Sequence, residues 1–96
     1  MKMIKASKNV FHDVGFGKEE AANLKVRSML MVEIERYIKR EKITQAEAAK
    51  RFGVTQPRVS DLIRGKINLF TTDMLIKMLA SAGLAVNVHV DRKKAA

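Results

Sequence analysis

Apolar residues recur with helical spacing along most of the chain, and this period predicts an all-α domain over residues 18–83. Residues 18–42 read as one long helix, or as two helices broken near Asn23. Its acidic first turn and basic last turn match the helix dipole. The apolar stripe expected to face the core consists of Val26, Leu30, Ile34, Tyr37 and Ile38. Residues 1–17 lack a helical period, so we expect an extended, partly flexible segment there.

Three shorter helices are predicted after the long one. Thr44, with Glu47 three residues later, has the pattern of a capping box that begins a helix, and Gly53 ends it. A second short helix runs to about Arg64 before Gly65. Thr71 or Thr72 caps a third, which Gly83 ends. Their expected inner faces are Ala46, Ala48, Ala49 and Phe52, then Val59, Leu62 and Ile63, then Met74, Leu75, Met78, Leu79 and Ala82.

Pro57 is the only proline, and it follows the first short helix closely. Proline is tolerated in the first turn of a helix, where backbone N–H groups lack partners. Either Thr55 caps the second helix and Pro57 is its second residue, or Gln56 caps it and Pro57 is its first. Both interpretations give two short helices joined by a tight turn that contains glycine. This pattern predicts a helix-turn-helix over residues 44–65.

A helical wheel of the second short helix separates a buried side from a polar side. The polar side is the surface that a recognition helix presents to the major groove. Glutamine can pair with adenine, arginine with guanine, and serine with several base edges. We expect Asp61 to orient Arg58 or Arg64, or to accept from cytosine. An ordinary solvated face with ion pairs is the alternative. The candidate base-facing residues are Gln56, Pro57, Arg58, Ser60, Asp61 and Arg64.

Residues flanking the two helices suit contacts with the phosphate backbone. Gln45 opens the first helix, where free N–H groups and a side chain can hold a phosphate. Lys66 and Asn68 follow Gly65 in a predicted loop. Such contacts position a protein without reading sequence. With the base-facing set, the predicted DNA-binding residues are Thr44, Gln45, Thr55, Gln56, Pro57, Arg58, Ser60, Asp61, Arg64, Lys66 and Asn68.

The apolar period changes to two over residues 84–90, which predicts a β-strand before a charged tail, 91–96. One strand cannot pair its own backbone groups, and exposed strand edges pair with other chains. We therefore expect antiparallel pairing with a second copy in a twofold homodimer. Pairing with the N-terminus of the same chain is the alternative. The expected dimer-interface residues are Leu84, Val86, Val88 and Val90.

Composition narrows the function further. A chain of 96 residues with a net charge of +9 favours one domain with a polyanionic partner, although the charge is spread along the sequence. The absence of cysteine excludes disulfides and thiolate metal sites. No metal, cofactor or catalytic motif is recognisable, so we expect neither a cofactor nor an enzyme. Without a signal peptide or membrane-length apolar run, we expect a cytoplasmic protein with no membrane partner. RNA binding is disfavoured because few aromatic residues are free to stack on bases.

Residues 44–66, "TQAEAAKRFGVTQPRVSDLIRGK", resemble the XRE family of Cro/repressor-like helix-turn-helix proteins. The residues that carry the likeness are Thr44, Gln45, Ala49, Gly53, Thr55, Ser60, Leu62 and Gly65. Over residues 9–90 the chain is similar to small bacterial XRE-type regulators. Many of these are HigA-type antitoxins encoded beside a RelE/HigB-like toxin, a ribosome-dependent RNase, whereas others are stand-alone or phage regulators.

This resemblance implies an all-α fold, a compact five-helix lambda-repressor-like bundle to which the predicted C-terminal strand is added. It also implies double-stranded DNA contacts from Gln45, Gln56, Arg58 and Ser60. A homodimer would repress its own operon at a palindromic operator in the nucleoid. Pro57 departs from the longer polar residue of many relatives, which reduces direct base reading. The alternative function is a protein-interaction module that neutralises a small RNase toxin through residues 1–17 and the long helix.

Overall fold

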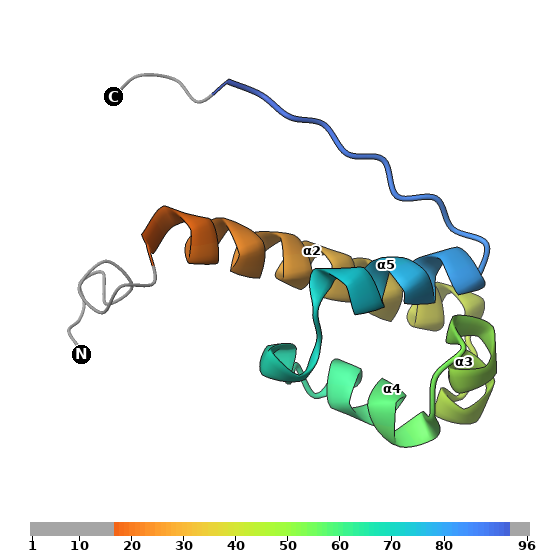
Figure 1. Cartoon of the computed structure of the whole chain (residues 1–96). Helices are drawn as coiled ribbons and strands as arrows, with labels where there is room; N and C mark the ends of the chain where they lie inside the picture. The colour runs from red at the N-terminus through yellow and green to blue at the C-terminus, as the bar shows by residue number, and fades with distance from the viewer. Residues whose placement is uncertain (1–16, 93–96) are drawn as a thin grey trace.

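The computed structural model describes residues 17–92, and the regular secondary structure within this range is helical. The elements are α2 (Gly17–Glu41), α3 (Gln45–Phe52), α4 (Gln56–Ile63), the 3-10 turn η1 (Ile67–Leu69) and α5 (Thr72–Ser81). α5 packs along α2, and α3 packs against both α4 and α5 (Figure 1). The predicted all-α core is therefore confirmed. The expected extended segment lies outside the described residues except for Gly17, which begins α2.

The segment that the sequence left as one helix or two is a single helix, α2. Asn23 lies inside it, and its side-chain oxygen accepts from Nε of Arg27 at 2.8 Å. The prediction that Val26 faces the core is wrong, since this residue is 45% exposed. The N-terminal part of α2 extends past the other helices (Figure 1), and the position that faces them there is Arg27.

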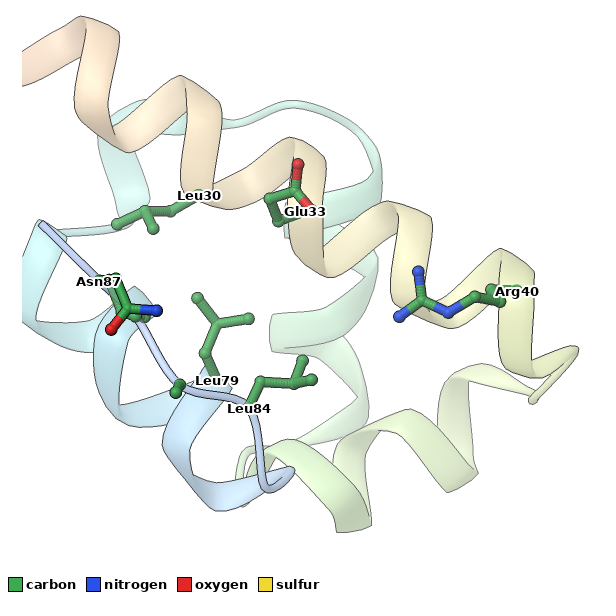
Figure 2. Close-up of a pocket in the computed structure, with 8 residues that line it drawn as sticks. Leu30, Glu33, Arg40, Leu79, Leu84 and Asn87 are labelled. Atoms are coloured by element: carbon green, nitrogen blue, oxygen red, sulfur yellow. The ribbon is translucent and has the colours of Figure 1, made fainter.

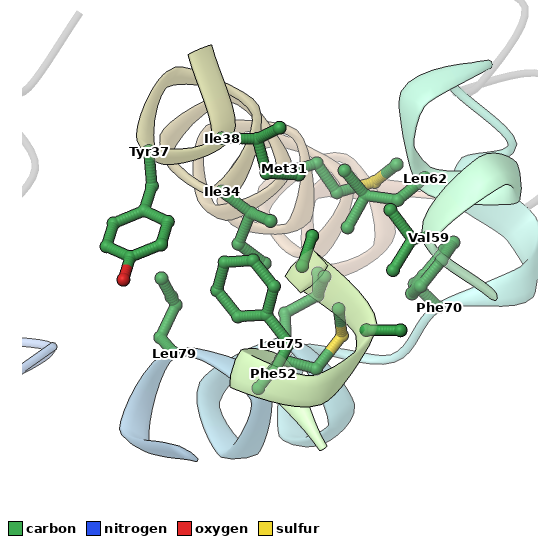
Figure 3. Close-up of a cluster of buried hydrophobic side chains, with 13 residues drawn as sticks. Met31, Ile34, Tyr37, Ile38, Phe52, Val59, Leu62, Phe70, Leu75 and Leu79 are labelled. Atoms are coloured by element: carbon green, nitrogen blue, oxygen red, sulfur yellow. The ribbon is translucent and has the colours of Figure 1, made fainter. Parts of the chain in front are cut away.

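The core lies between α2, α3, α4 and α5, and each helix contributes side chains to it (Figure 3). Phe52 meets Tyr37 edge to face, with ring centroids 5.4 Å apart. Ala48 is fully buried, so α3 approaches its neighbours closely. Fully burying a large apolar side chain contributes about 1.5–3 kcal/mol. The largest fully buried side chains are Ile34, Phe52, Val59, Phe70 and Leu75.

Two predictions about the fold are not supported. Residues 17–92 contain four α-helices and one 3-10 turn rather than five helices, and the chain after Gly83 forms no β-strand in that range. Residues 84–92 instead run as extended chain away from α5 (Figure 1). The physical reason is that a strand is defined by a neighbouring strand, and no segment within 17–92 pairs with this one.

The extended segment is only partly packed. Leu84 and Val86 contact the hydrophobic core, whereas Val88 and Val90 are 79% and 85% exposed. A pocket beneath the segment is lined by Leu30 of α2 and Leu79 of α5 as well as Leu84 (Figure 2). The dimer expected from the sequence would bury all four alternating apolar residues of this segment. Within the single chain, only Leu84 and Val86 pack against the core.

Candidate nucleic-acid interface

The first helix of the predicted unit begins as its sequence indicates. Thr44 is the N-cap of α3, and its hydroxyl accepts from the backbone N–H of Glu47 at 3.1 Å. The capping box is half formed, because the Glu47 carboxylate accepts from Nε of Arg51 at 3.4 Å instead. Thr44 is exposed and Gln45, the first residue of α3, is half-buried. Both therefore lie at the helix end where backbone N–H groups can meet a phosphate.

The turn between α3 and α4 depends on Gly53. Its φ of 69° and ψ of 33° place it in the left-handed region, which favours glycine. The N–H of Val54 donates to the carbonyl of Ala49 at 3.0 Å, which closes the end of α3. A Cβ atom on Gly53 would lie 3.1 Å from Oγ of Ser81, and the hydroxyl of Ser81 donates to the carbonyl of Arg51 at 2.9 Å. α5 thus packs closely against this turn.

Arg51 attaches α3 to α2. Its Nη1 donates to the hydroxyl of Tyr37 at 3.0 Å and to Oε1 of Glu41 at 3.3 Å. The hydrogen bond with Tyr37, followed by those with Glu41 and Glu47, raises the pKa of Arg51. Arg51 therefore holds the helix-turn-helix against α2, although it lies within the motif.

The structure decides where α4 begins. Thr55 is the N-cap, with extended φ and ψ of −81° and 159°, and its hydroxyl accepts from the N–H of Arg58 at 3.3 Å. Gln56 is then the first helical residue and Pro57 the second. Thr55, Gln56 and Pro57 are all exposed, while Val59 further along the helix is buried. The N-terminal end of α4 is therefore open to solvent (Figure 1).

Arg58 is half-buried and is held by the protein itself. Its Nη1 donates to the carbonyl of Leu69 at 3.1 Å, and its guanidinium carbon lies 5.5 Å from the centroid of the Phe70 ring. To reach a base edge, this side chain would have to leave both contacts. Local sequence patterns do not indicate these contacts, because they join α4 to residues at the end of η1, at least 11 positions later in the chain.

Asp61 contacts a different partner from the two that the sequence suggested. Its Oδ1 lies 3.8 Å from Nζ of Lys66, whereas Arg58 is held by Leu69 and Phe70. The cause is the reversal after Gly65, at a φ of 74°, which returns the chain toward α4. The N–H of Lys66 donates to the carbonyl of Asp61 at 3.1 Å, so the two residues are also joined through the backbone.

None of the predicted DNA-binding residues is buried in the core. α4 and the turns at its two ends carry all of them except Thr44 and Gln45, which begin the adjacent helix α3. The half-buried members are Gln45, Arg58, Ser60 and Asp61. The exposed members are Thr44, Thr55, Gln56, Pro57, Arg64, Lys66 and Asn68.

Sequence reasoning missed Arg27, which lies on α2 and reaches the turn after α4. Its Nη1 lies 3.2 Å from the carbonyl oxygens of both Ile67 and Phe70, and its side chain is only 12% exposed. One signal was available in the sequence. Arg27 precedes Met31, Ile34 and Ile38 at helical spacing, so a charged residue occupies the end of the buried stripe.

Residues 17–92 contain neither a candidate metal site nor a helix that could span a membrane. No group of three or more His, Cys, Asp or Glu side chains in that range could hold a metal ion. No helix there is both long enough and apolar enough to cross a lipid bilayer.

Comparison with known proteins confirms the resemblance seen in the sequence. The chain matches the family described as "Helix-turn-helix domain" over residues 10–91. It is similar to a solved structure titled "Putative XRE Family Transcriptional Regulator", with 29% identity and a TM-score of 0.73, covering 80% of this chain and 90% of that one. No curated protein matches it. The chain therefore belongs to the helix-turn-helix domain family and is an XRE-type helix-turn-helix protein.

Proposed function

We propose that this protein is a sequence-specific DNA-binding transcriptional regulator, a repressor, whose helix α4 enters the major groove. The observation that carries the proposal is the two-sided character of α4. Val59 and Leu62 are buried against the rest of the bundle, while Thr55, Gln56 and Pro57 at its N-terminal end are exposed. Recognition helices contact base edges with their N-terminal residues.

The chemistry of the candidate side chains suggests a division of roles. Gln56 is suited to adenine, and Arg58 to guanine once it leaves Phe70. Ser60 and Arg64 extend the same helix, and Pro57 offers an apolar contact for a thymine methyl group. Contacts to phosphate would come from the flanking residues Thr44, Gln45, Lys66 and Asn68. The net charge of +9 adds a long-range attraction for any duplex.

We further propose that the protein acts as a homodimer on a palindromic operator. Residues 84–90 are the proposed contact, because Val88 and Val90 are left exposed beyond the packed Leu84 and Val86. A second copy running antiparallel would pair the backbone groups of this segment and cover both valines. Two recognition helices would then stand about 34 Å apart, which is one turn of DNA.

The biological setting follows from this role. A small dimeric repressor of this type would regulate its own operon in the cytoplasm, associated with the nucleoid. An antitoxin encoded beside a RelE/HigB-like toxin is one form of such a regulator, and a stand-alone or phage regulator is the other. Detection of a toxin gene beside an operator half-site would distinguish these forms.

The alternative function is a module that neutralises a small RNase toxin, with DNA binding secondary. One observation favours it: Val26, Met29 and Val32 form an exposed apolar strip on α2, 40–59% exposed. Exposed apolar patches frequently mark protein contacts. The expected toxin contacts before Gly17 lie outside the described residues. Co-purification with a small basic RNase would support this alternative, and a protein that binds only DNA would contradict it.

The proposed regulator is tested by selecting binders from a random duplex library at near-physiological salt. An enriched inverted repeat, with half-sites about one helical turn apart, is expected for a dimeric repressor. Salt-sensitive binding without a consensus would contradict sequence-specific regulation, because charge alone produces it. In that case the protein-interaction function would become the leading candidate.

A further inference from the structure

Arg27 contacts both its own helix, α2, and the η1 turn, which lies far from it in sequence. Its Nε donates to Asn23 at 2.8 Å, and its Nη2 lies 3.4 Å from Oε2 of Glu20, so α2 itself orients the guanidinium. Its Nη1 then contacts the carbonyl oxygens of Ile67 and Phe70, each at 3.2 Å. One arginine thus spans the two ends of the η1 turn.

The η1 turn is held from a second side by α4. Arg58 donates to the carbonyl of Leu69, which lies between the two carbonyls that Arg27 contacts. Hydrogen bonds from a charged donor are roughly twice as strong as neutral ones. In the free protein the turn is therefore fixed to both α2 and α4, although it contains only three helical residues. Once Arg58 turned toward a base, Arg27 would be the contact that still holds the turn.

The same turn presents two of the proposed phosphate contacts. Lys66 precedes η1 and Asn68 lies within it, and both side chains are exposed. A contact that is already ordered before binding loses less conformational entropy when the complex forms. Arg27 would therefore favour binding by ordering the turn, although its own side chain is nearly buried.

We propose that Arg27 is a positioning residue of the DNA interface, which contacts no DNA itself and holds the η1 turn so that Lys66 and Asn68 meet the phosphates beside α4. This inference rests on the proposed DNA-binding function. It assigns a role in binding to a helix outside the helix-turn-helix, and it differs from a purely structural role because it acts through Lys66.

The test is a double-mutant cycle between Arg27→Ala and Lys66→Ala on a random-sequence duplex, with salt varied between about 50 and 200 mM. Loss of one phosphate contact lowers the salt slope of log K by about 0.9. We expect each single variant to lower the slope by at least this amount. The double variant should lose no more than Arg27→Ala alone, because Lys66 is already misplaced there.

Two further variants control for the lost charge and for the fold. Arg36→Ala deletes the same charge from the same helix, where Arg36 is exposed and pairs with Glu33, and should leave the slope unchanged. Arg27→Gln retains a donor for one carbonyl if Arg27→Ala does not fold, and should lower the slope partially. If the wild type binds DNA but the losses of Arg27→Ala and Lys66→Ala simply add in the double variant, the role of Arg27 is overturned and the proposed function stands. A wild type that fails to bind any duplex would overturn the proposed function.

Amide hydrogen exchange tests the same role without DNA. The N–H groups of Leu69 and Phe70 donate to the carbonyls of Lys66 and Ile67 at 3.0 and 3.1 Å. Arg27→Ala should accelerate exchange of both amides by about tenfold or more, while amides of α3 keep their protection. Unchanged exchange in the turn would overturn the inference, and so would equal acceleration throughout the protein.

Discussion

The guanidinium carbon of Arg58 lies 5.5 Å from the centroid of the Phe70 ring, so the strongest candidate for reading a base is paired inside the free protein. A cation–π contact of this kind is worth about 0.5–1 kcal/mol at an exposed site. A bidentate arginine–guanine pair is worth about 1–3 kcal/mol of discrimination. The proposed guanine pair would therefore have to offset both this contact and the hydrogen bond to Leu69, and these two contacts order the side chain in the free protein.

Replacing Arg58 should change which sequences are bound. Arg58→Ala is expected to cost about 1–3 kcal/mol on the selected operator and to relax specificity at one base pair. Repeating the library selection with the variant measures both effects. Arg58→Lys is the matched control, because it keeps the charge but lacks the planar fork, and should also lose that base preference. Equal losses on the operator and a scrambled duplex would remove Arg58 from the base-reading residues.

Lys66 should contribute to every duplex alike. Lys66→Ala is expected to weaken binding about uniformly across sequences and to reduce the salt slope by about 1. Titration of the operator and a scrambled duplex at several salt concentrations checks this. Lys39→Ala removes the same charge from the exposed surface of α2 and should have little effect. A loss confined to the operator would show that Lys66 reads sequence.

Gly53 and Gly65 allow the turn geometry to be separated from the contact with α5. Both have positive φ, 69° and 74°, so alanine at either should cost about 1–2 kcal/mol of stability. A Cβ at Gly53 also meets Oγ of Ser81 at 3.1 Å, whereas nothing lies within 4 Å at Gly65. Urea unfolding should therefore show Gly53→Ala to be the less stable variant, and equal stability would indicate that Ser81 yields without cost.

Two leucines test how strongly the core depends on α5. Leu75 is fully buried, and Leu75→Ala should lower the free energy of unfolding by about 2–5 kcal/mol through lost burial and a residual cavity. Leu69 is 47% exposed, so Leu69→Ala is the control with the same chemistry, and its loss should be much smaller. Chemical denaturation measures both, and comparable losses would contradict this assignment of the core.

The proposed dimer predicts that the exposed end of residues 84–90 can be altered without loss of the fold. The double variant Val88→Asp, Val90→Asp places like charges where two copies would meet, at residues 79% and 85% exposed in the single chain. Sedimentation should show a monomer with unchanged helical content and weaker operator binding. A dimer that persists would exclude these valines from the interface.

The sequence by itself predicted both helices of the motif and, to within a residue, where each begins and ends. Thr44, Thr55 and Thr71 cap α3, α4 and α5 as their hydroxyls suggest, and Gly53 takes the left-handed conformation expected of it. These features are local, because a capping hydroxyl acts on an N–H only three residues away. The sequence alone left two caps open, Thr55 or Gln56 for α4 and Thr71 or Thr72 for α5. The structure selects Thr55 and Thr71, and the hydroxyl of Thr71 accepts from the N–H of Met74 at 3.1 Å.

The tertiary structure decided which polar residues are free to bind and which support the fold. Arg58 lies over the ring of Phe70, and Asp61 pairs with Lys66. Arg27 donates to the carbonyl of Ile67, which lies 40 residues later in the chain. The tertiary structure also left residues 84–90 without the strand that their alternation predicts. The physical reason is common to all of these. A helix start depends on neighbouring residues, whereas a side-chain partner or a paired strand depends on which distant segments the packing of α2 to α5 brings together.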